Sequence, residues 1–194
     1  NVFRISATEI VLEYDNPANE GYAQVYLQPK GMKSSKHTFT KGDFGLNSAE
    51  NEEMEGHEGP ATTKEGFKWY LDVEAGAELF IWKTWGALQV GAGWSTNADL
   101  HVKSIKLHTT DIPGNIKSIN VVCAYSDESD QKKAELYAKV GGENFGTRKS
   151  LKNEMSTYTF TDSISASGEI ELIWDSQEAG ISYFIKSVEV IYQD

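Results

Sequence analysis

The chain has 194 residues, of which 39% are hydrophobic and 11% aromatic, enough apolar material for a packed core rather than a disordered chain. The protein is acidic: its formal net charge of -11 disfavours binding to nucleic-acid phosphates and to anionic membrane surfaces. Neutral ligands, cations and basic partners remain open. No apolar run reaches the roughly 18 residues that a membrane-spanning segment needs, so none is predicted.

Short stretches rich in Val, Ile, Thr, Tyr and Phe alternate with turn-forming Gly, Asn, Asp and Ser along the whole chain, a pattern typical of strands. No segment keeps the apolar period of an amphipathic helix. The predicted strands are residues 3–14, 22–29, 36–42, 67–74, 77–85, 87–93, 100–110, 116–126, 133–142, 156–164, 168–176 and 182–192. We therefore predict an all-β protein, with residues 1–194 forming a single antiparallel β-sandwich of the jelly-roll type.

Residues 45–66 are polar and acidic, and their sequence predicts a long acidic loop. Because calcium prefers carboxylate oxygens, Glu52, Glu53 and Glu55 are candidate ligands for a structural calcium ion. The regular spacing of a calcium-binding loop is absent, however, and a solvated run of charge is the alternative. The four histidines are scattered without the spacing of a zinc site.

Residues 67–74, FKWYLDVE, carry two neighbouring aromatic side chains. In a strand Trp69 and Tyr70 point to opposite faces, so at most one of them joins a surface site. We keep Trp69 as a candidate ligand-binding residue.

Aromatic side chains are densest in residues 77–94, which contain Trp82, Trp85 and Trp94. Trp82 lies inside a predicted strand, and we interpret it as packing. Trp85 and Trp94 lie at a strand end and a turn, where a ring at the rim of a sandwich exposes one face. Sugar rings pack their C–H faces on such aromatics, so both are candidate glycan-binding residues. Packing in the core is the competing interpretation for each.

Two further residues are predicted to lie in the core. Cys123, the single cysteine, stands in the apolar run INVVCAY and is interpreted as a small buried hydrophobe. Trp174, within IELIWDS, is interpreted in the same way.

The last predicted strand has mixed character on both faces, which predicts a central strand covered on both sides. Strict alternation groups Phe184, Lys186, Val188 and Val190 on one face, and Tyr183, Ile185, Ser187, Glu189 and Ile191 on the other.

Several motifs recur in one order within residues 88–192. They are an I-K-x-I-x-V strand, a V-G-G-x-x-F-G hairpin, a Y-T-F strand and a closing strand, here Ile116–Val121, Val140–Gly146, Tyr158–Phe160 and Tyr183–Tyr192. This order resembles the exported galactose-binding-like, carbohydrate-binding-module-like jelly-roll domains of Bacteroidetes surface proteins. The resemblance implies a jelly roll, export to the bacterial envelope or cell surface, and a non-catalytic role. It carries no fixed binding residues, because such modules differ mainly in their loops.

Together these observations predict a non-catalytic secreted or cell-surface module that binds glycans. The alternative is a structural or adhesive module whose partner is a surface protein. A jelly-roll glycoside hydrolase or lyase is a third hypothesis, because the carboxylate pair that it needs is defined in space rather than in sequence. No nucleophile elbow or phosphate-binding loop is present, which favours the non-enzymatic hypotheses.

Overall fold

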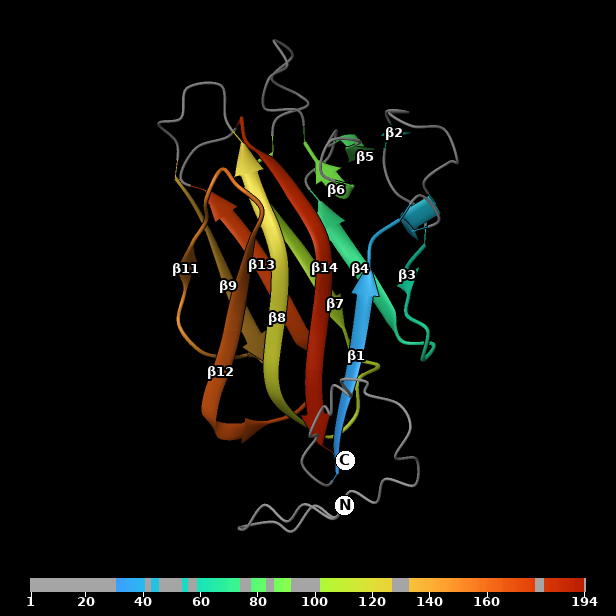
Figure 1. The fold of residues 1–194 in the computed structure, drawn as a ribbon, viewed down its shortest axis with the longest axis vertical. Coiled ribbons are helices and arrows are strands. Elements are labelled where there is room, and N and C mark those ends of the chain that lie inside the picture. Colours follow the sequence, from blue (N-terminus) through green and yellow to red (C-terminus); the bar gives the residue numbers. More distant parts are fainter. Residues whose placement is uncertain are drawn as a thin grey trace, which may run out of the picture.

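The structure, a computed structural model, describes residues 31–40, 43–45, 54–55, 59–73, 78–82, 86–91, 102–126, 133–176 and 180–193. Apart from the short 3-10 helix η1 (Asp43–Gly45), the regular elements in these ranges are strands. All of their pairings are antiparallel, and they form two sheets that face each other (Figure 1).

Each sheet contains seven strands among the described residues. Sheet 1 consists, in spatial order, of β12 (Ser156–Ala166), β8 (Asn115–Ser126), β14 (Ser182–Gln193), β6 (Ala87–Val90), β5 (Glu78–Trp82) and β2 (Met54–Glu55), with β1 (Met32–Thr38) also paired to β14. Sheet 2 consists of β10 (Glu143–Asn144), β9 (Ala134–Val140), β13 (Ile170–Ser176), β7 (Ser104–Thr109), β4 (Lys68–Val73) and β3 (Ala61–Thr62), with β11 (Lys149–Ser150) also paired to β9.

The strand pairings are those of a rolled hairpin. From β6 to β9 the chain alternates between the two sheets, and the later strands pair with these in reverse order. Thus β6 pairs with β14, β7 with β13, β8 with β12, and β9 with β10 and β11. This is the topology of a jelly roll. The predicted antiparallel jelly-roll sandwich is confirmed.

The core lies between the sheets and follows from period-two burial along their strands. In β9 and β13 every second residue is buried, so alternate side chains point inward. Trp174 of β13 is fully buried, as predicted, and belongs to one hydrophobic cluster to which strands of both sheets contribute. No helix in the described part of the chain is long and apolar enough to cross a membrane.

Most predicted strands from residue 67 onward correspond to observed strands within a few residues at each end. The two predicted strands at residues 3–14 and 22–29 lie outside the described residues. The prediction that residues 45–66 form only a loop needs correction, because β2 and β3 fall within them. Each of these strands has two residues, too few for an alternating pattern to be visible in the sequence.

The alternation predicted for the last strand is wrong beyond Ile185. The register of β14 against β8 shifts between Ile185 and Ser187, which leaves Lys186 as an extra, exposed residue. A β-bulge of this kind reverses the direction of every later side chain. The core cluster therefore takes Tyr183 and Ile185 before the bulge and Val188, Val190 and Tyr192 after it. The backbone N–H of Phe39 donates to the Lys186 carbonyl at 3.0 Å.

Cys123 is fully buried on β8, as the sequence predicts. Burial raises the pKa of its thiol to about 12, although the neighbouring Trp174 indole acts in the opposite direction. That indole N–H lies near the sulfur but has no acceptor in hydrogen-bond geometry, so we regard the contact as weak.

We expect Cys123 to be inert to thiol reagents in the folded protein. With a pKa of about 12, only about one thiol in ten thousand is ionised at pH 8, and the thiolate is the reactive form. Maleimide labelling followed by mass spectrometry should be far slower in buffer than in guanidinium chloride. Equal rates in the two conditions would contradict the burial of this residue.

The turn between β9 and β10 contains two glycines with positive φ, 61° at Gly141 and 87° at Gly142. A Cβ at Gly141 would lie 2.5 Å from the Ser167 carbonyl oxygen, whereas a Cβ at Gly142 would meet nothing within 4 Å. The two positions therefore share the backbone requirement and differ in the space available.

This difference predicts unequal effects of alanine. Gly142→Ala should lower the free energy of unfolding by about 1–2 kcal/mol, the cost of a left-handed backbone at a non-glycine residue. Gly141→Ala should lower it further, because the Ser167 carbonyl must also move. Chemical denaturation of both variants measures the difference, and equal losses would contradict the close approach of Ser167.

Candidate functional site

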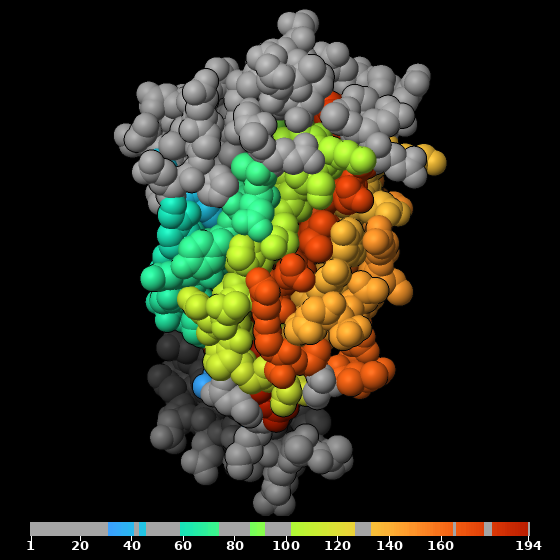
Figure 2. Space-filling view, turned by 180° about the vertical axis from the view of Figure 1, so that it is seen from behind, coloured from blue at the N-terminus to red at the C-terminus, as the bar shows by residue number. Residues whose placement is uncertain are grey.

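An exposed aromatic side chain, that of Tyr70 on β4, lies on the outer face of sheet 2. Figure 2 views this face, on which β4, β7, β13 and β9 run side by side. In β4 the burial alternates, so Trp69 is only 1% exposed and Tyr70 is 42% exposed. In the described ranges the large hydrophobic side chains that are exposed are those of Tyr70 and Ile164, and of these Tyr70 is the aromatic one.

The imidazole of His108 lies beside the Tyr70 ring. The two residues are register partners on β4 and β7, and their ring centroids are 5.8 Å apart with an interplanar angle of 37°. Nδ1 of His108 lies 2.9 Å from Glu169 Oε1, and Nε2 lies 3.5 Å from Asp72 Oδ1. Each ring nitrogen thus faces a carboxylate, which fixes the imidazole next to Tyr70.

A lysine links the carboxylates of two strands on the same face. Nζ of Lys106 lies 2.9 Å from Asp72 Oδ2 and 3.6 Å from Glu171 Oε1. Partial burial tends to raise the pKa of Asp72, but the hydrogen bond and charge of Lys106, with a smaller contribution from His108, outweigh it and lower that pKa. The hydrogen bond to Asp72 correspondingly raises the pKa of Lys106. We call this surface the Tyr70 face; it comprises Tyr70, Asp72, Lys106, His108, Glu169 and Glu171.

A second tyrosine on sheet 2 is already covered. The guanidinium carbon of Arg148 lies 4.1 Å from the centroid of the Tyr137 ring on β9. Nη1 of the same arginine lies 3.3 Å from Glu135 Oε2. This cation–π contact occupies a face of Tyr137, so Tyr70 is the better platform for a ligand.

The Tyr70 face combines two kinds of group that sugar recognition requires. An exposed tyrosine ring offers an apolar surface for the C–H face of a sugar ring. The carboxylates accept hydrogen bonds from sugar hydroxyls, and the Lys106 ammonium donates them. Because charged neighbours already orient these side chains, their ordering is in place before a ligand arrives.

The structure separates the candidate residues named from the sequence. Trp69 is packed in the core, so its ring has no face open to a ligand, and its neighbour Tyr70 reaches the surface instead. Trp85 and Trp94 lie outside the described residues, as do Glu52 and Glu53. For Glu55 and Trp82 the structure describes the backbone, in β2 and β5, and not the side chains.

The described ranges contain no group of three or more His, Cys, Asp and Glu side chains placed to hold a metal ion. The calcium prediction for the acidic segment therefore stays a prediction, since its residues are outside these ranges or lack a described side chain.

Sequence reasoning missed the cluster around His108. The spacing of Tyr70 and Asp72, and that of Lys106 and His108, places each pair on one face of its own strand. Nothing local indicates that β4 and β7 are neighbours, and the cluster forms only through their register, Tyr70 to His108 and Asp72 to Lys106.

Comparison with known proteins gives structural neighbours but no family. No family model matches the chain, and no curated protein matches it. Among solved structures, a family 29 carbohydrate-binding module is similar at 12% identity and a TM-score of 0.46, covering 84% of this chain and 90% of the other. A family 29 module from Piromyces equi gives 13% identity and a TM-score of 0.45, covering 82% and 90%. A family 61 module in complex with β-1,4-galactotriose gives 11% and 0.42, covering 65% and 88%.

The ion pair between Asp72 and Lys106 predicts a pH-dependent contribution to stability. Because the pKa of Asp72 is lowered by folding, its contribution is present above the ordinary carboxylate pKa of about 4 and is lost as the pH falls through the lower, folded-state value. Both groups are partly exposed, so the contribution should be at most about 1 kcal/mol.

Asp72→Asn tests this directly. The difference in free energy of unfolding between the native protein and the variant, measured by urea denaturation, should shrink as the pH falls below about 4. A difference that stays constant or grows below about pH 4 would contradict the assignment.

Proposed function

We propose that the protein is a non-catalytic module that binds glycans, with the Tyr70 face as its binding surface. The observation that carries the proposal is the 42% exposed Tyr70 ring, flanked by His108 and by charged groups that are held in place. A large exposed ring beside fixed hydrogen-bonding groups is the composition expected of a ligand site.

The dimensions of this face favour an oligosaccharide over a single sugar. From β4 to β9 the sheet crosses three strand spacings, about 14 Å in all. Polar side chains continue across this width, because the register places His108, Glu171 and Lys139 in turn beyond Tyr70. A chain of sugars lying across the strands would stack on Tyr70 at one end and meet hydrogen-bonding groups beyond it.

A glycan array screened with the purified protein tests the proposal, with hits confirmed by titration of soluble oligosaccharides. Tyr70→Ala should weaken binding about tenfold or more, because it removes the stacking surface. Thr157→Ala, an exposed position on the opposite sheet, is the control and should bind as the native protein does. Oligosaccharides should bind more tightly than the corresponding monosaccharide.

Two outcomes would redirect the proposal. If Tyr70→Ala binds normally and the double variant Trp85→Ala/Trp94→Ala does not, the site lies on the aromatics named from the sequence instead. A blank across neutral and acidic glycans would favour the structural or adhesive alternative, with a protein partner. Running the screen with calcium and again with a chelator tests the calcium prediction for Glu52, Glu53 and Glu55.

Export to the envelope or cell surface belongs to the same proposal and is supported by the motif order of residues 88–192. Immunodetection in fractionated and protease-treated cells of the source organism measures it.

A further inference from the structure

The imidazole of His108 lies in the middle of the Tyr70 face. Its register partners are Tyr70 on β4 and Glu171 on β13, one on each side. Its side chain is 22% exposed, compared with 57% for Asp72 and 42% for Glu169, so it is the most enclosed of these three. The charged side chains around it are Lys68 and Asp72 of β4, Lys106 of β7 itself, Glu171 of β13 and Glu169 immediately before β13.

The two carboxylate contacts of His108 are both favourable only when its ring is protonated. A neutral imidazole has one N–H donor and one acceptor nitrogen, whereas an imidazolium has two donors. With Nδ1 2.9 Å from Glu169 and Nε2 3.5 Å from Asp72, the imidazolium attracts both carboxylates. In a neutral ring with its proton on Nδ1, the Nε2 lone pair faces an Asp72 oxygen, and the two electron-rich atoms repel each other. The proton therefore decides whether both carboxylates are tied to the same ring.

The ion pair beside the ring keeps its charges in the pH range where imidazoles titrate. The hydrogen bond and charge of Lys106 lower the pKa of Asp72, and Asp72 in turn raises the pKa of Lys106. Imidazoles gain and lose their proton between about pH 5 and pH 8, a range in which Asp72 stays negative and Lys106 positive. A change of pH in this range therefore acts on the Tyr70 face through the proton of His108.

The charge of His108 also acts on the Tyr70 ring. The two ring centroids are 5.8 Å apart, within the distance of about 6 Å at which a cation is attracted to an aromatic ring. A neutral imidazole lacks this attraction. Because the Tyr70 side chain is largely exposed, it depends on such neighbours for a fixed position.

We propose that His108 is a positioning residue of the Tyr70 face, whose protonated ring holds Asp72, Glu169 and the Tyr70 ring in one arrangement and so tightens glycan binding at mildly acidic pH. The inference rests on the proposed function, because it takes the Tyr70 face to be the glycan site. Loss of the proton leaves the side chains in several arrangements, of which a glycan must select one, and that selection costs affinity.

A ligand-free measurement tests the positioning itself. The His108 ring signals, assigned by their loss in His108→Gln, are followed by NMR from about pH 5 to pH 8. The nuclear Overhauser contact between the His108 and Tyr70 rings should weaken along the same curve on which the imidazole loses its proton. A contact that keeps its strength throughout would overturn the inference, whether or not a glycan binds.

The second measurement is the affinity for the neutral oligosaccharide that binds most tightly on the glycan array. A neutral probe has no titrating group, so any pH dependence comes from the protein. Calorimetric titration should show about fivefold weaker binding at about pH 8 than at about pH 5.5, the effect of one hydrogen bond. His108→Gln should bind at both pH values about as the native protein does at pH 8.

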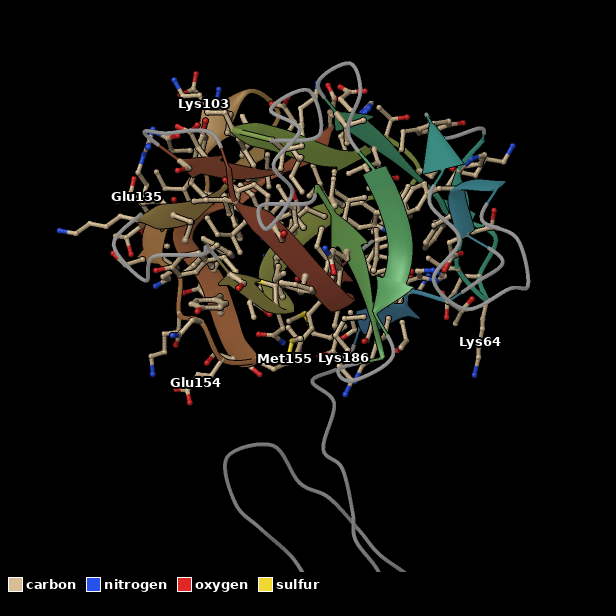
Figure 3. The ribbon with its side chains drawn as sticks, turned by 90° about the horizontal axis from the view of Figure 1, so that it is seen from above. Lys64, Lys103, Glu135, Glu154, Met155 and Lys186 are labelled. Atoms are coloured by element: carbon tan, nitrogen blue, oxygen red, sulfur yellow. The ribbon has the colours of Figure 1, made fainter. Side chains whose placement is uncertain are left out.

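His37→Gln is the matched control, because Nε2 of His37 also faces a carboxylate, that of Asp43 at 3.0 Å. His37 belongs to sheet 1, which also contains β14. Figure 3 shows Lys103, which precedes β7, and Lys186 of β14 on opposite sides of the molecule. With folding verified by circular dichroism, His37→Gln should keep the native pH dependence of binding.

The outcomes separate this inference from the proposed function. Affinity that is constant or higher at pH 8, in a protein whose binding is lost in Tyr70→Ala, overturns the inference and leaves the proposed function standing. A native pH dependence in His108→Gln does the same. A blank glycan array removes the proposed function and, with it, the effect of His108 on affinity.

Discussion

The pairing of β14 along both of its edges is the constraint on which the rest of sheet 1 depends. One edge pairs with β8 for nearly the whole length of the strand. The other edge is shared, with β6 paired to Tyr183–Ile185 and β1 to Ser187–Gln193. The bulge at Lys186 stands where one partner gives way to the other, and the Lys186 carbonyl accepts the hydrogen bond from Phe39 at that junction. A single irregular residue thus lets one strand serve two neighbours while keeping apolar side chains in the core.

Sheet 2 has a comparable dependence on register, with consequences for its surface. Because Leu71 lies opposite Leu107 inside the sandwich, Tyr70 and His108 must lie opposite each other outside it. The register that buries the core side chains therefore also positions the Tyr70 face, and no additional backbone has to be ordered to form it. The charged neighbours then restrict the rotamers of the polar side chains, which are the part of the surface that burial does not fix.

Much of this architecture follows from local sequence, and the remainder has an identifiable physical origin. Period-two alternation located most strands, and it placed Trp69 and Tyr70 on opposite faces. It could not say which of the two points inward, because that depends on the pairing of β4 with β7. The sequence around Lys186 does not indicate the bulge, because buried and outward-facing residues alternate regularly both before and after it. The cluster of Asp72, Lys106 and His108 joins two strands, β4 and β7, whose proximity is a property of the topology alone.

The rolled pairing also has a consequence for how the chain reaches this state. The contacts that close sheet 1 are remote in sequence: Gln89 and Ser182, 93 positions apart, approach across β6 and β14, and Ser34 and Glu189 meet across 155 positions. Closing such long loops costs entropy before any contact is gained, which makes high-contact-order folds slow to form. Until β14 has been synthesised, the facing edges of β6 and β8 are unpaired in a growing chain. The interval before the last strand docks is therefore the stage at which this protein is most open to aggregation through its strand edges.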